Sequence, residues 1–452
     1  MSIYNTELVQ EQETRSKRLK RNAIGSVAVK ISTMLVEVLK VPIMLSYLDV
    51  EKYGIWLTIV SIVLWTHHFD FGLGAGLKYK LTEAIANNNY NRAKHLVSTA
   101  YVSMSIIMGI VLLILTPIIY NVNWHDLLNV SSPSISNIEL QHTVFGVLIV
   151  FIFQFILSLI GVVLQSYQRT ALSEVFKPIG SFISLGLVLV IGLFSHNSLI
   201  IASLVMVAPY VVILIILNLF FFKGIYSKIS PSIKWAKKSY LTDIYSLGVK
   251  FFINQLSSLI VFATANFILS SMINPSEVSI YSTARTYYGI VLIFLTSILV
   301  SASTPITDAF VRKDYQWIKQ CMNRLYKVAY LAIILEIFIL TISDFAFQIW
   351  VGDKLVVPIS LAIAFVIFNT MAFFTQQFSH FLISVGKMNL NVIISCCKII
   401  AFIPVAIILV KAWGAVGLVI TTIIVNTLPN LIFGGIQYKK IISGTAKGIW
   451  NK

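Results

Sequence analysis

Long apolar runs alternate with short polar segments along almost the whole chain. Most runs are about 20 residues or longer, which lets a helix cross a hydrocarbon core of about 30 Å. The pattern predicts about twelve transmembrane helices, at 23–48, 54–76, 96–120, 142–166, 176–195, 198–222, 246–272, 279–304, 324–349, 356–384, 388–410 and 414–438. The polar segments between them are too short for a soluble domain, so the predicted fold is an all-α polytopic membrane protein.

The polar start of the chain reads as a tail and not as a secretory signal. Residues 1–22 end in a basic cluster, and the apolar run that follows is too long for the apolar region of a signal peptide. This run also lacks a cleavage site of small residues. We therefore expect an uncleaved first helix.

Lysine and arginine show which side of the membrane each loop faces. With the N-terminus in the cytoplasm, 27 of the 34 basic residues fall in cytoplasmic segments and only Lys52, Lys354 and Lys411 fall on the other side. This asymmetry predicts that both ends of the chain are cytoplasmic. The expected location is the inner membrane of a bacterium.

The composition agrees with this assignment and removes one alternative. The chain is 57% hydrophobic and 12% charged, about half the charge of a soluble domain. Its net charge of +16 is spread over loops with no folded domain to present it to nucleic acid, so contact with anionic lipid headgroups explains it better. The three cysteines offer no disulfide framework.

An internal repeat appears when the sequence is compared with itself at an offset of 225 residues. Residues 48–101 match 273–326 without gaps, and polar positions match as well as apolar ones. The centre of the match is LTEA at 81–84 against ITDA at 306–309. Both copies have the same orientation, which predicts two parallel halves around a pseudo-twofold axis along the membrane normal.

This repeat divides the chain into five predicted parts. They are a tail (1–22), a six-helix bundle (23–222), a linker (223–245), a second six-helix bundle (246–438) and a C-terminal tail (439–452). Two such halves usually enclose a central cavity. The repeated segment also reads as a short amphipathic helix at the inner surface, so Glu83 and Asp308 are candidates for a gate; simple anchoring at the interface is the alternative.

Ionisable residues inside predicted spans are candidates for function because burial of a charge in the membrane is costly. Lys30, Glu37 and Lys40 lie within an arc of about 80° on the first span. Glu37 and Lys40 can neutralise each other at this spacing. Lys30 lies nearer the cytoplasmic end, where its side chain can reach the interface.

Two further cations lie in the second half. Arg285 has no acidic neighbour on its own helix, and its guanidinium suits bidentate contact with phosphate or carboxylate. Pairing with Glu336 or Glu37 on another helix is the alternative. Lys398 shares a helix face with Asn391 and Ser395.

Glu336 is a candidate for a proton or cation site, because it lies well inside a late span. The predicted spans hold four cations against two well-buried acids, Glu37 and Glu336, and this balance favours an anionic substrate. A metal site is not expected, because adjacent histidines such as His67 and His68 point in different directions on a helix. No cofactor is expected; a gradient of H⁺ or Na⁺ is a candidate for coupling, and whether transport is coupled stays open.

Motifs of enzymes are absent from the sequence. It contains no glycine-rich phosphate loop of nucleotide hydrolases, no nucleophile elbow and no zinc-protease motif. The longest predicted external loop, at 121–141, holds only Asp126 and Glu139 as acids. We therefore expect a transporter and not an enzyme.

Two motifs at the ends of the second span resemble a known family. LDVEKYGIW at 48–56 is followed by FDFGLGAGL at 69–77, and the second half repeats the first motif as INPSEVSIY at 273–281. This combination resembles the Wzx-type polysaccharide flippases of the multidrug/oligosaccharidyl-lipid/polysaccharide superfamily. The resemblance in length, topology and repeat extends over the whole chain and implies a V-shaped fold like that of multidrug exporters.

The resemblance implies a substrate and a mechanism. Such flippases move O-antigen or capsule repeat units on undecaprenyl pyrophosphate to the periplasmic leaflet by alternating access, and other polysaccharide-assembly proteins are possible partners. The expected phosphate-binding cations are Arg285, Lys40, Lys398 and Lys30. A cation-coupled multidrug exporter of the same superfamily is the alternative, although acids would then be expected to dominate the cavity.

Overall fold

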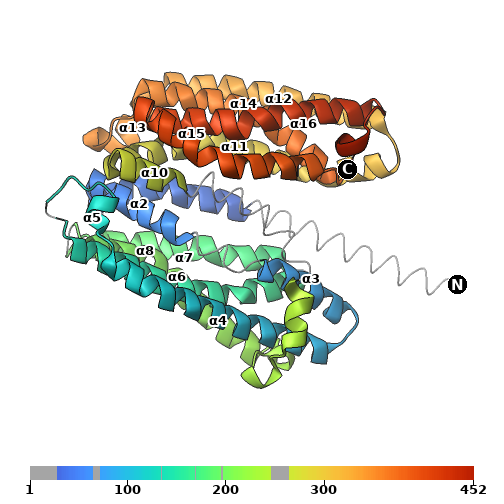
Figure 1. Ribbon diagram of the computed structural model, residues 1–452, viewed down its shortest axis with the longest axis horizontal. Coiled ribbons are helices and arrows are strands. Elements are labelled where there is room, and N and C mark those ends of the chain that lie inside the picture. Colours follow the sequence, from blue (N-terminus) through green and yellow to red (C-terminus); the bar gives the residue numbers. More distant parts are fainter. Residues whose placement is uncertain are drawn as a thin grey trace. The chain divides into compact units, whose positions relative to one another are not determined.

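The computed structural model describes residues 28–64, 72–133, 135–167, 169–194, 197–245 and 264–451. Within these ranges every regular element is helical and no residue lies in a β-strand, which confirms the all-α prediction (Figure 1). The predicted tail at 1–22, the pair His67–His68 and residues 246–263 of the predicted seventh span lie outside the described residues.

The helices follow one another closely along the chain. The first described helix covers 28–47. It is followed by α2 (Val50–Leu64), α3 (Leu73–Ala86), α4 (Tyr90–Asn121), α5 (Trp124–Leu127), α6 (Asn137–Ser166), α7 (Thr170–Ile191) and α8 (Leu199–Lys223). After two short 3-10 turns and a helix at 238–245 come α10 (Thr264–Met272), α11 (Pro275–Val311), α12 (Tyr315–Thr341), α13 (Ser343–Val351), α14 (Ile359–Ser384), α15 (Asn389–Thr421) and α16 (Leu428–Ile442).

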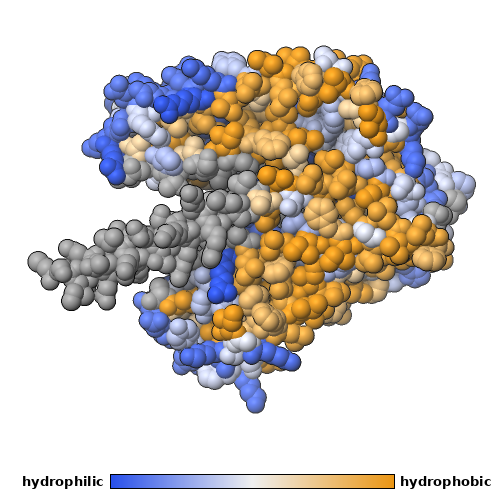
Figure 2. Space-filling model, turned by 180° about the vertical axis from the view of Figure 1, so that it is seen from behind, coloured by the Kyte–Doolittle hydropathy of each residue, from blue (hydrophilic) through white to orange (hydrophobic). Residues whose placement is uncertain are grey.

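Many of these helices are long and apolar enough to cross a membrane. Within the described residues, seven helices are long and apolar enough to cross a membrane, judged by length and composition. The count of candidate spans becomes eight if the bent pair of α12 and α13 is one span. Large apolar side chains such as Leu113, Leu193 and Ile400 are more than 70% exposed. Figure 2 shows such residues covering a broad surface with hydrophilic ones at its margins. A surface of this kind is stable in lipid and not in water.

The last of these seven helical stretches is too long for one span. Asn389–Ile442 comprises 54 residues, which would be about 80 Å of straight helix. It breaks at Trp413 and Gly414, where Gly414 has a φ of 55° that favours glycine. This break lies at the predicted boundary between the last two spans. The total of twelve spans and their orientation remain predictions.

The chain forms two compact units. The first contains 1–43, 66–122 and 138–252, and the second contains 44–65, 123–137 and 253–452. In the first unit, Leu96, Val147 and Leu164 are buried on α4 and α6. In the second unit, one core joins α11, α12, α14 and α16 through residues such as Met322 and Phe373. The predicted six-helix bundles with a linker at 223–245 remain a prediction.

The repeat predicted from the sequence is visible in the backbone at the same offset. α2 and α11 begin 225 residues apart, as do α4 and α12, and the ends of α3 and α11 are also 225 residues apart. In the turn that follows, Asn88 and Lys313 both have positive φ, at 53° and 61°. Asn89 and Asp314 each cap the next helix by accepting a backbone N–H three residues later.

The two copies differ in the middle. In the second copy α11 runs without interruption over 37 residues. In the first copy the described part of α2 reaches Leu64, and α3 begins after Gly72, which has a left-handed φ of 81°. The expected short helix is therefore a separate element only in the first copy. In the second copy, residues 306–309 form part of the last two turns of α11.

Candidate functional site

A buried acid lies in the second unit, where α11, α12 and α14 pack together. Glu336 on α12 is completely buried and Asn369 on α14 is 2% exposed. The Asn369 amide Nδ2 donates to Glu336 Oε1 and, at 2.8 Å, to the backbone oxygen of Tyr288 on α11. Glu336 Oε2 is left without a hydrogen-bond partner among the described residues.

The surroundings of this acid are largely aromatic. Tyr287 and Tyr288 pack edge to face, and Tyr287 contacts Phe347 with ring centres 4.7 Å apart. The Tyr287 hydroxyl donates to the Ile339 oxygen at 3.0 Å. Since a buried carboxylate with a free oxygen is costly, this position favours a neutral carboxyl or a bound cation.

Lys398 is a buried cation of the second unit. It lies on α15 with 6% of its surface exposed, near the buried residues Ser395 and Phe402. Its ammonium group makes no hydrogen bond or ion pair with the part of the chain that the structure describes. A lysine in this position can stabilise an anion that does not belong to the protein.

Arg285 lies on an exposed face of α11, one turn after the buried Tyr281. Of the two acids considered as its partners from the sequence, Glu336 accepts a hydrogen bond from Asn369 in this unit, and Glu37 forms an ion pair with Lys40 in the first unit. Tyr281 itself packs against Phe365 on α14 with ring centres 5.5 Å apart.

Three of the predicted residues lie in the first unit, on the helix at 28–47. Glu37 and Lys40 form an ion pair, in which the Glu37 side chain is 50% exposed and that of Lys40 is 14% exposed. Lys30 is also exposed. Glu37 is therefore not the well-buried acid that the sequence led us to expect, since half of its side-chain surface is left uncovered by the described residues. Glu336 is the one of the two that is buried.

Of the two gate candidates, Glu83 lies in a charged network in the first unit. Its carboxylate is 3.6 Å from Lys80 Nζ and 3.4 Å from Arg92 Nη1, and Arg92 Nη2 is 3.6 Å from Asp243. These contacts join α3, α4 and the helix at 238–245. Asp308 lies near the end of α11, and its side chain is outside what the structure describes.

A set of contacts that sequence reasoning missed lies at the predicted external ends of α2 and α11, within the second unit. Ser279 Oγ donates to the Val50 oxygen at 2.6 Å. Gly54 passes so close to α11 that a Cβ there would lie 1.7 Å from the Pro275 oxygen. We call this the α2–α11 crossing. Only a residue without a side chain fits at position 54.

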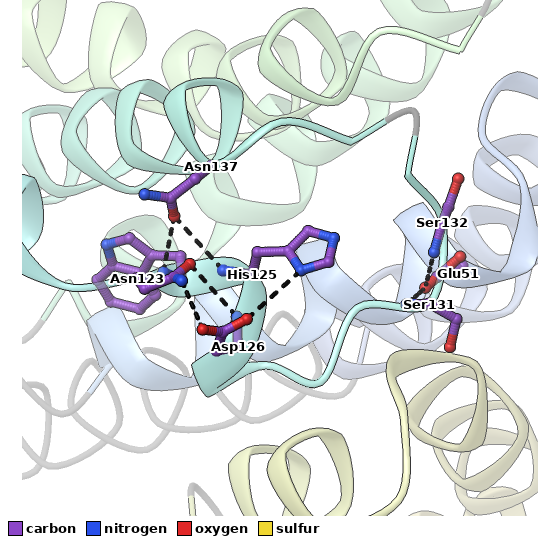
Figure 3. A network of polar contacts seen from close by, with 8 residues as sticks. Glu51, Asn123, His125, Asp126, Ser131, Ser132 and Asn137 are labelled. Carbon is purple, nitrogen blue, oxygen red and sulfur yellow. Dashed lines mark hydrogen bonds and ion pairs between the residues drawn. The ribbon is translucent and has the colours of Figure 1, made fainter.

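The loop after α4 is held in the same region. Glu51 Oε1 on α2 accepts the backbone N–H groups of Ser131 and Ser132, and Asn137 Oδ1 accepts that of Trp124 at the start of α5 (Figure 3). Ser270 Oγ on α10 donates to the Leu128 oxygen at 2.9 Å. Residues 123–137 are thus fixed to α2 and α10.

No group of three metal-ligating side chains occurs within the described ranges. Among the predicted site residues, Glu336 and Lys398 are buried, and Arg285 and Lys30 are exposed.

Comparison with known proteins identifies the family. A profile described as polysaccharide biosynthesis protein matches residues 19–310, well over half of the chain. The chain belongs to this family. This confirms the resemblance read from the two motifs. A member of this family with so many apolar helices is a multi-pass membrane protein.

Relatives of known description agree with this membership. The chain is 22% identical over 372 residues to a "Putative O-antigen export protein" of Yersinia pseudotuberculosis, covering 80% of this chain and 82% of that protein. It resembles an inward-facing multidrug resistance MATE family transporter of the MOP superfamily with a TM-score of 0.76 at 14% identity, covering 94% and 98% of the two chains. An outward-facing MATE transporter gives 0.59 at 14% identity, covering 96% and 97%.

These structures share their fold with this polysaccharide biosynthesis family member. The MATE-like fold predicted from the resemblance is therefore confirmed. Family and fold together place the protein among membrane transporters and flippases.

Proposed function

We propose that the protein is a flippase for lipid-linked oligosaccharides in the bacterial inner membrane. The substrate would be an O-antigen or capsule repeat unit on undecaprenyl pyrophosphate, moved from the cytoplasmic to the periplasmic leaflet by alternating access. The observation that carries this proposal is Lys398, a buried cation that pairs with no acid among the described residues. A pyrophosphate is a ligand that such a cation would stabilise.

This substrate needs a protein to cross the membrane. A pyrophosphate and its sugars cannot cross hydrocarbon unaided, because charges and hydroxyls lose their hydration there. The polyprenyl tail can remain in the bilayer. Cations that line a shielded path would replace the lost hydration of the phosphates. Arg285 is our second choice for this role, and Lys40 and Lys30 follow. No enzymatic step is required.

Deletion of the gene tests the proposed substrate. Surface polysaccharide should disappear while lipid-linked repeat units accumulate in the inner membrane, because assembly continues inside without export. The measurement is gel analysis of the polysaccharide together with extraction of the lipid-linked intermediates. Unchanged surface polysaccharide in the deletion strain would contradict the proposal.

Complementation of this strain tests the two cations. Lys398→Gln and Arg285→Ala should each abolish polysaccharide export at normal protein levels. Lys411→Gln, an exposed lysine on the same helix as Lys398, and Arg324→Ala on α12 serve as matched controls and should complement fully. Full complementation by Lys398→Gln or Arg285→Ala would remove that residue from the proposed substrate path.

The buried Glu336 favours a second candidate, a cation-coupled exporter of small molecules. Its free Oε2 in an aromatic environment suits a carboxyl that binds and releases H⁺ or Na⁺. In inverted vesicles, uptake of a cationic dye should then collapse with the proton or sodium gradient and be lost in Glu336→Gln. If a strain that lacks the gene still exports the dye normally, the result contradicts the exporter and supports the flippase.

A further inference from the structure

The segment that follows α8 in the first unit is an ordered strap. We use this name for residues 224–237, which lie along the first turns of α4. Its backbone is held by α4 side chains: Ser98 Oγ accepts the Ser232 N–H at 3.1 Å, and Thr99 Oγ1 accepts the Lys237 N–H at 3.1 Å. His95 Nδ1 lies 2.7 Å from the Trp235 oxygen, and a carbonyl can only accept.

Ring contacts hold the strap at both ends. Tyr226, only 3% exposed, stacks on Tyr167 with ring centres 4.5 Å apart. Burial, with smaller contributions from Tyr90 and Tyr226, raises the pKa of Tyr167 to about 12, so its hydroxyl remains neutral. At the other end, the His95 ring packs against Trp235 with ring centres 5.0 Å apart. The strap is therefore a fixed surface of the protein.

This fixed surface presents apolar side chains outwards. Ile225 is 62% exposed and Ile233 is 81% exposed, although Ile229 between them is buried. A groove of about 430 Å³ lies between the strap and α4, lined among others by Val102, Ile106 and Ile233. From there the exposed residues Ile110 and Leu113 continue along α4 at helical spacing. The groove thus opens onto the apolar face that this helix presents to lipid.

Positive charge surrounds the same surface. Lys223, Lys228, Lys234, Lys237 and Lys238 are all exposed. None of the five forms an ion pair with an acid in the described ranges. Lys228 lies over the Tyr90 ring at 5.5 Å and leaves its charge available. An apolar groove beside unpaired lysines is complementary to an amphiphile with a negative head.

We propose that the strap is a binding site for an anionic glycerophospholipid of the adjoining leaflet. One acyl chain occupies the groove between Ile233 and Ile106 and continues along α4, and the phosphate lies among the lysines. Ile225 and Ile233 enter the interface of the bilayer. The strap thereby fixes the first unit to an anionic membrane surface. This lipid site is separate from the proposed path of the transported substrate.

The depth of Ile233 in the bilayer tests the apolar part of this proposal. Ile233→Cys is made in the full chain with Cys321, Cys396 and Cys397 replaced by serine, labelled with a nitroxide and reconstituted into vesicles with about one third phosphatidylglycerol. The label should be relaxed by oxygen and protected from a water-soluble nickel chelate. Ser227→Cys, an exposed polar position of the same strap, is the matched control and should be accessible to nickel.

The number of lipids that remain bound tests the charged part. Native mass spectrometry of Lys234→Gln/Lys237→Gln/Lys238→Gln should show phosphatidylglycerol retention reduced several-fold. Lys439→Gln/Lys440→Gln/Lys447→Gln, three basic residues near the C-terminus, should retain it. Lys237→Gln keeps the backbone N–H that Thr99 accepts, so the strap stays anchored.

A nickel-accessible label at 233 overturns the proposal, as does unchanged lipid retention in the strap variant. The first result would point to an acidic protein partner on this surface instead. The second would show that the groove does not select for charge. Neither result bears on polysaccharide export, which is measured separately by complementation.

Discussion

Glu336 and Lys398 are both buried in the second unit, and each lacks a counter-ion in a different way. Glu336 has one hydrogen bond, from Asn369, and one oxygen with none among the described residues. Lys398 has no protein partner in the part that the structure describes. In our proposal a mobile species stabilises each of these groups: an ion or proton at Glu336, and an anionic substrate group at Lys398.

At the residue scale, Asn369→Ala should destabilise the second unit. The change leaves both oxygens of Glu336 and the Tyr288 oxygen without the amide donor, which costs about 1–3 kcal/mol for a buried group. Thermal unfolding of the purified protein in detergent measures the loss. Asn430→Ala is the control, because Asn430 is half-buried and bonds only one backbone oxygen of its own helix. Equal unfolding temperatures for the two variants would contradict this account.

At the element scale, the α2–α11 crossing depends on a glycine that leaves room for another helix. Ser279 is the repeat equivalent of Gly54, and Pro275 is the equivalent of Val50, each 225 residues further along. Gly54 faces Pro275, and Ser279 bonds Val50. The same two positions of the repeat therefore make both contacts, once in each direction. α2 and α11 cross at corresponding points of the two repeats.

Gly54→Ala should force these helices apart, because the added Cβ would lie 1.7 Å from the Pro275 oxygen. Overpacking of this kind typically costs about 1–3 kcal/mol. Gly289→Ala on α11 is the matched control, since its Cβ would meet nothing within 4 Å. Thermal unfolding should separate the two variants, and a Gly54→Ala protein as stable as Gly289→Ala would show that the crossing is looser than described.

At the scale of the whole molecule, the proposed alternating access would open the predicted external end in one state. The contacts of residues 44–65 and 123–137 with α10 and α11 would then have to break. Cross-linking Val50→Cys to Ser279→Cys with a short bifunctional methanethiosulfonate, which forms a disulfide with each cysteine, should stop polysaccharide export by the otherwise cysteine-free chain. Reductant should restore export, and neither single cysteine should respond. Full export by the cross-linked protein would show that this contact stays closed during transport.

The sequence predicted those parts of the molecule that local chemistry determines. Apolar length located the helices, and the predicted boundary between the last two spans, at 411–413, coincides with the break at Trp413 and Gly414. The repeat was visible in the sequence, and both copies form the same turn, at Asn88 and Lys313. The burial and the contacts of single side chains were not predictable, because they depend on residues far away in the sequence. Glu37 lies on an apolar helix like Glu336 does, and only packing decides that one is exposed and the other covered. The lysine-rich strap resembled a simple linker because its anchors, Ser98 and Thr99, lie in another helix.

The α2–α11 crossing has a consequence for the origin of the protein. A contact in which each side presents the same positions to the other is the contact that two identical subunits make across a twofold axis. Two copies of a single ancestral chain could have met through this surface before duplication joined them. The difference between Gly54 and Ser279 would then have arisen after the duplication: the glycine allows close approach, and the serine hydroxyl forms a hydrogen bond across the contact.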